Sequence, residues 1–124
     1  MIMEVLSKTV GRYLFAIPFF IFGIFHFMGA QDMAAMIPGW LPGGVIWVII
    51  TGIALIAAAI SIIVRVLDFL ATFLLGIMLL LFLLILHLPG ALEGDQMATS
   101  SLLKDLALAG ASWLYAGYIA RKPS

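Results

Sequence analysis

The residues of this chain best suited to chemistry are two histidines, His26 and His87, each near the end of a long apolar stretch. A neutral imidazole can donate a hydrogen bond to a quinone carbonyl or ligate haem iron. The pair is therefore compatible with a quinone, and less so with haem because no haem motif accompanies it. Methionines fall on the same side, but in apolar segments they usually pack, so no metal site is predicted.

The two histidines are predicted to lie at similar depth, because the apolar stretches that carry them run in the same direction. This places His26 and His87 in one hypothetical cofactor pocket on the outer side, together with Gly23, Phe27 and Trp40. The plainer interpretation is two separate interfacial histidines, each hydrogen-bonded to a nearby loop carbonyl. That interpretation is favoured because an ionisable group costs little near the interface.

The composition indicates that lipid surrounds the chain. Of its 124 residues, 65% are hydrophobic and 10% are charged, whereas soluble domains have roughly 45–50% and about 25%. A chain of this length cannot bury so much apolar surface within itself. The net charge is zero and there is no cysteine, so a nucleic-acid partner, disulfides and thiol catalysis are not expected.

The two histidines are predicted to lie on helices that span a membrane. The apolar run 45–88 is broken only by Arg65 and Asp68, and its length fits two crossings of about 20 residues each. The sequence predicts one domain over 1–124, an all-α integral membrane four-helix bundle. Its predicted spans are 11–29, 44–64, 66–88 and 102–120, with an interfacial outer loop at 30–43.

The basic residues set the predicted orientation. Five of six fall on one side of the predicted spans, which the positive-inside rule assigns to the cytoplasm. Both termini are therefore predicted to be cytoplasmic, in a bacterial-type inner membrane. Four of the basic residues are predicted to anchor the topology at the lipid surface: Arg12, Arg65, Arg121 and Lys122. Arg65 is also expected to pair with Asp68, and Ser100 or Ser101 to cap the last helix.

In this order, the features resemble the DoxX-like family of small bacterial membrane proteins. The matching residues are Arg12, the stretch Gly23-x-x-His26-Phe27, Pro38, Thr51-Gly52, Arg65 and His87. The resemblance implies four spans with cytoplasmic ends and a link to membrane redox processes, since the family is named after a subunit of a thiosulfate:quinone oxidoreductase. One departure is that apolar residues 53–56 stand where many members carry an acid.

Three functions follow as expectations. The first is an accessory subunit that binds a protein partner or further copies of itself in the membrane, in a redox or respiratory setting. The second is a quinone-binding oxidoreductase module that uses the histidine pair, and the third, implied by distant relatives of the family, is a chaperone for membrane proteins. Few acids or bases lie within the spans, which argues against proton-driven transport and favours a role without catalysis.

Overall fold

The computed structural model describes residues 1–121, and all the regular structure in this part of the chain is helical. The all-α prediction is confirmed. The segments, in chain order, are α1 (Ile2–Val5), the π-helical η1 (Leu6–Val10), α2 (Gly11–Met28), α3 (Ala30–Ala34), α4 (Val45–Val64), α5 (Asp68–Phe82), the π-helical η2 (Leu83–His87), α6 (Leu88–Leu92) and α7 (Gln96–Tyr118).

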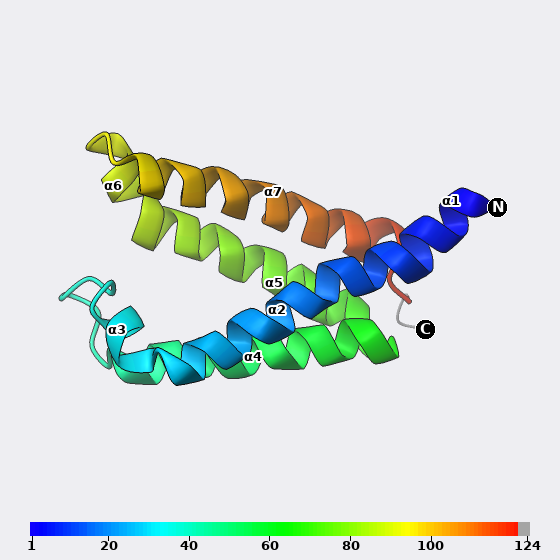
Figure 1. Cartoon of the computed structure of the whole chain (residues 1–124), viewed down its shortest axis with the longest axis horizontal. Coiled ribbons are helices and arrows are strands. Elements are labelled where there is room, and N and C mark those ends of the chain that lie inside the picture. The colour runs from blue at the N-terminus through cyan, green and yellow to red at the C-terminus, as the bar shows by residue number, and fades with distance from the viewer. Residues whose placement is uncertain (122–124) are drawn as a thin grey trace.

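The helices form two hairpins that are joined at one end and separate at the other (Figure 1). α2 packs along α4, and α5 packs along α7, while α4 and α5 meet near the turn that joins them. We call the end with this turn the closed end, and the end with α3 and α6 the open end. In the described residues, no Cα atom of α2 lies within 8 Å of one in α5 or α7.

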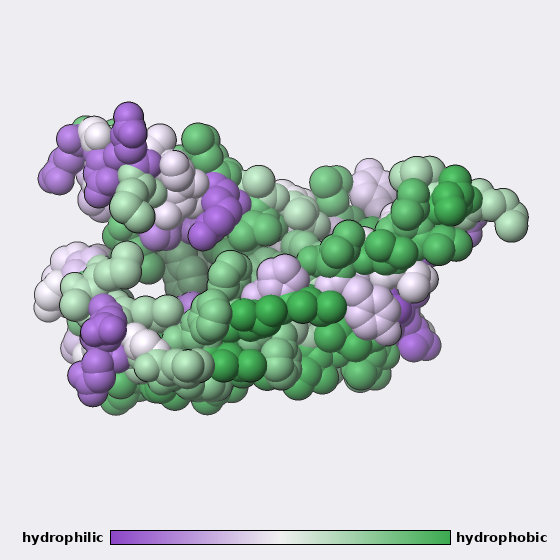
Figure 2. All heavy atoms as spheres, in the orientation of Figure 1, coloured by the Kyte–Doolittle hydropathy of each residue, from purple (hydrophilic) through white to green (hydrophobic). Residues whose placement is uncertain are grey.

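Three helical stretches are long and apolar enough to cross a membrane: Ile2–Met28, Val45–Val64 and Asp68–Leu92. They include neighbouring short segments, because α1, η1 and α2 run on as one helix, as do α5, η2 and α6. α7 is long enough, but Lys104, Asp105 and its polar first turns lower its hydropathy. On the face that Figure 2 shows, hydrophobic residues cover most of the length of the helices, and hydrophilic ones gather mainly at the two ends.

Glycines allow the close approach of α2 and α4. A Cβ atom on Gly23 would lie 2.9 Å from the carbonyl oxygen of Gly52, and one on Gly52 would lie 3.0 Å from the carbonyl oxygen of Gly23. Small residues at a helix crossing let two backbones pack closely in an apolar environment. Beside this crossing, Phe19, Leu55, Ala59 and Leu75 belong to the main buried core.

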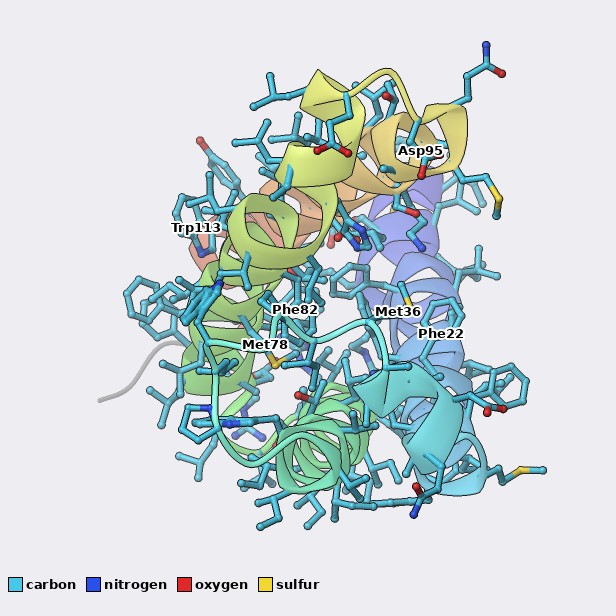
Figure 3. The ribbon with its side chains drawn as sticks, turned by 90° about the vertical axis from the view of Figure 1, so that its left-hand side faces the viewer. Phe22, Met36, Met78, Phe82, Asp95 and Trp113 are labelled. Atoms are coloured by element: carbon cyan, nitrogen blue, oxygen red, sulfur yellow. The ribbon has the colours of Figure 1, made fainter. Side chains whose placement is uncertain are left out.

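The start of α7 differs from the prediction. The helix begins at Gln96, and the carboxylate of Asp95 caps it by accepting a hydrogen bond of 2.9 Å from the backbone N–H of Met97. Asp95 lies at the exposed head of this helix (Figure 3). The expected cap at Ser100 or Ser101 was wrong, because both residues lie inside the helix.

We expect Asp95→Ala to lower the free energy of unfolding by about 1 kcal/mol, because it removes the side-chain acceptor for the first turn of α7. Denaturation followed by far-UV circular dichroism would measure the change. Glu93→Ala is the matched control, since Glu93 is exposed two residues earlier and lies outside the helix. Equal effects of the two substitutions would contradict the assigned cap.

Candidate functional site

The open end holds the candidate site, because the molecule is hollowed there between the two hairpins (Figure 2). Figure 3 looks into this end. Met78 and Phe82 of α5 face Phe22 of α2 and Met36 of the loop that follows α3. Aromatic and methionine side chains offer flat and adaptable apolar contacts. The hollow therefore suits an apolar ligand.

A histidine and a carboxylate meet at this end of the α5–α7 hairpin. The His87 Nε2 atom lies 3.2 Å from Oδ2 of Asp105. The His87 side chain is 17% exposed and that of Asp105 is 7% exposed. A carboxylate beside one ring nitrogen favours one orientation of the imidazole. The other ring nitrogen, Nδ1, has no protein partner within residues 1–121 and is free to bind a ligand.

The π-helical segment η2 positions His87. It covers Leu83–His87, directly after the regular turns of α5, and its backbone contacts α7. A π-turn takes more residues than an α-turn, so it rotates the side chains that follow it around the helix, and such turns often occur at functional sites. In this chain, η2 ends on the histidine that meets Asp105.

Asp105 keeps an unused acceptor. Its Oδ2 atom is buried and receives no hydrogen bond from the described residues, because the contact with His87 has the geometry of an ion pair and not of a hydrogen bond. Leaving a buried acceptor unsatisfied costs about 1–3 kcal/mol. Such orphaned groups point to a function or to a missing partner.

Lys104 brings the second hairpin into the site. Its Nζ atom lies 5.8 Å from the centre of the Phe22 ring, which is within the range of a cation–π contact. Because Lys104 is on α7 and Phe22 is on α2, this contact crosses the space between the hairpins. The site thus combines a cation, an acid–histidine pair and aromatic rings contributed by both halves of the molecule.

Three other residues of the predicted outer pocket, Gly23, His26 and Phe27, gather around the α2–α4 crossing. Gly23 is buried against Ile56, and the side chains of His26 and Phe27 lie beside Gly52. The ring of His26 contacts the carbonyl oxygen of Phe22 on its own helix through Nδ1, at 2.6 Å. The plainer interpretation expected a loop carbonyl here, whereas the carbonyl that His26 contacts belongs to its own helix α2.

The backbones that carry His26 and His87 lie apart, and Trp40 is largely exposed. No Cα atom of α2 lies within 8 Å of one in η2, in the part of the chain that the structure describes. Trp40 lies in the loop before α4 and is 70% exposed. A single pocket that contains all five residues therefore stays a prediction, and His87 is the member whose contacts belong to the open end.

The closed end carries a second polar cluster around Asp68, which is 0% exposed. Its carboxylate accepts hydrogen bonds from the Tyr115 hydroxyl at 2.8 Å and from the Arg121 backbone N–H at 3.2 Å. Arg65 Nε lies 3.7 Å from the same carboxylate, so the expected Arg65–Asp68 pair is confirmed. The cluster joins α5 to the end of α7 through groups that are far apart in sequence.

Arginines also cap the helix ends here. Arg12 donates to the carbonyl oxygens of Ile62 and Ile63 at the end of α4, and Arg65 donates to that of Ile119 beyond α7. Cationic side chains stabilise the unpaired carbonyls at helix C-termini. These arginines, predicted as topology anchors at the lipid surface, therefore also hold the fold. Lys122, the last predicted anchor, lies outside the described residues.

Sequence reasoning missed Asp105 and Lys104 as site residues. Both fall near the start of the predicted span 102–120, but neither was singled out as a candidate site residue. An available signal was that an acid and a base one turn or more inside an otherwise apolar helix need a partner. Among residues 1–121, no group of three or more histidine, cysteine, aspartate or glutamate side chains is arranged to hold a metal ion.

Comparison of the chain with protein-family models, curated proteins and solved structures finds no match in any of the three. The class that fold and site define is thus a helical protein with three membrane-length helices and an acid–histidine pair at its open end.

Proposed function

We propose that this protein is a four-span, DoxX-like protein of a bacterial inner membrane, with both ends in the cytoplasm. Three membrane-length helices support the membrane location. α7 is proposed as the fourth span because it packs along α5 and buries Ala109, Ser112, Tyr115 and Ala116. The basic residues of the closed end support the orientation, since cytoplasmic ends are enriched in them.

We further propose that the open end binds a quinone. The single observation that carries this proposal is the His87–Asp105 pair beside an apolar hollow. A quinone head group is a flat ring with carbonyl oxygens, and its reduced form has hydroxyl groups. Imidazole Nδ1 can accept from a hydroxyl when neutral and donate to a carbonyl when protonated. Phe22, Phe82 and the methionines would contact the ring faces.

The proposed role is that of an accessory subunit, which holds a quinone for a partner that carries electron-transfer groups. The apolar side chains exposed along the outer faces of the helices support contact with lipid or with another membrane protein. A partner is favoured over independent turnover because the site offers one acid–base pair. Two alternative functions rest on the sequence alone: association of this chain with further copies of itself, and a chaperone for membrane proteins.

The test compares the two histidines. We expect His87→Asn and Asp105→Asn each to weaken binding of decylubiquinone by about tenfold or more, because a hydrogen bond to a charged group contributes roughly 1.5–3 kcal/mol. Isothermal titration calorimetry in mild detergent would measure the affinity. His26→Asn is the matched control and should bind as the wild type does. Equal affinity in all four proteins would refute the assigned site.

A further inference from the structure

A second cavity lies at the closed end, away from the acid–histidine pair. Its volume is about 290 Å³, and it is formed where the N-terminal helix passes the C-terminal half of α7 (Figure 1). Phe15, Ala111, Leu114 and Ile119 give it apolar walls, and Ser7 and Arg12 give it one polar end. Small-ligand pockets measure roughly 300–1,000 Å³, so this one has room for a chain and not for a large head group.

Arg12 has one unused donor nitrogen at this cavity. Its Nε donates to the Lys8 carbonyl oxygen at 2.9 Å, and its Nη1 donates to the carbonyl oxygen of Ile62 at 3.0 Å. The remaining nitrogen, Nη2, donates to no group within residues 1–121 and is not among the buried unsatisfied atoms. The guanidinium is thus fixed in place by the protein, with the two N–H groups of Nη2 left for an anion.

The accessible charge around the cavity is positive. Lys8, Arg12 and Arg121 are partly or fully exposed at this end, and Arg65 is partly exposed. Of the acids here, Asp68 is fully buried and already bonded, which leaves Glu4 as the exposed one. A phosphate would therefore meet an excess of cations, and guanidinium groups bind phosphate well.

We propose that this cavity binds one anionic phospholipid, with its phosphate at Arg12 and part of one acyl chain between the N-terminal helix and α7. Charge complementarity selects the head group, and the apolar walls select a chain. Basic residues beside a membrane span commonly attract anionic lipids of the cytoplasmic leaflet. The proposal depends on the proposed membrane location and orientation, but not on quinone binding at the open end.

The test uses two probe lipids, phosphatidylglycerol and phosphatidylcholine, in equimolar nanodiscs. Native mass spectrometry of the released protein should show one phosphatidylglycerol adduct retained over phosphatidylcholine by about fivefold, the ratio that one cation gives at an anionic surface. Arg12→Gln should abolish the preference. Equal retention of both lipids by the wild type would overturn the proposal.

A cavity-filling variant keeps the test independent of the structural role of Arg12. Ala111→Phe places a ring in the cavity and leaves every cation in place, so retention of either lipid should fall. Gly110→Phe is its matched control, because a side chain at Gly110 meets nothing within 4 Å and should leave retention unchanged. Retention by Ala111→Phe equal to that of this control would also overturn the proposal. Decylubiquinone affinity should be the same in both variants, so failure here is distinct from failure of the quinone site.

Discussion

Replacing Asp68 with alanine should cost about 3–5 kcal/mol of the free energy of unfolding, the range for breaking a buried charge pair. The substitution would leave the Tyr115 hydroxyl and the Arg121 backbone N–H without their acceptor. It would also leave Arg65, whose Nε is already buried without a hydrogen bond, without its nearest counter-charge. Both hairpins depend on this cluster, because Asp68 begins α5 directly after the turn that joins them.

The measurement is reversible unfolding in mixed micelles, followed by circular dichroism. Asp32→Ala is the control, because Asp32 is exposed in the short helix α3 and should change the free energy of unfolding by less than about 0.5 kcal/mol. Tyr115→Phe should cost about 1 kcal/mol, since it deletes one hydrogen bond. If Asp68→Ala behaved like Asp32→Ala, the Asp68 cluster would not hold the closed end together.

Replacing Gly23 with leucine should separate α2 from α4 and destabilise the protein by about 3 kcal/mol, the upper end for overpacking a tight contact. Even the first carbon of the new side chain would lie 2.9 Å from the carbonyl oxygen of Gly52. Because this neighbour is backbone, no rotamer change can relieve the contact, and the helices must move apart.

The matched control is Gly110→Ala, an alanine at an exposed helical glycine where an added Cβ atom meets nothing within 4 Å. It should stabilise the protein by about 0.5–1 kcal/mol, because alanine loses less backbone entropy than glycine in a helix. Unfolding in mixed micelles gives both values on one scale. A loss below about 0.5 kcal/mol in Gly23→Leu would mean that the two helices do not cross at these glycines.

Local sequence predicted the helices and the turn between α4 and α5, because apolar length and an i, i+3 charge pair are properties of neighbouring residues. It did not predict that Tyr115 bonds Asp68 or that Asp105 meets His87. These partners lie on different helices, and their meeting depends on how each helix is rotated about its axis, which hydropathy does not set.

The predicted site likewise combines features that local sequence predicts with contacts between helices that it does not predict. His87 was identified from its residue type and its place at a span end, and the structure pairs it with an acid. Gly23 was assigned to a ligand pocket, but the structure uses it as a contact between helices. The rotation that η2 imposes on His87 has no counterpart in the periodicity of the sequence, since the stretch is apolar on all sides.

The two hairpins, tied at one end and apart at the other, give the molecule the form of a wedge (Figure 1). In the proposed orientation, the wedge displaces more lipid from the outer leaflet than from the inner one. Curving a membrane so that its outer leaflet expands would relieve this mismatch. The protein should therefore concentrate at strongly curved regions such as cell poles, and compressing the outer leaflet should push its hairpins together.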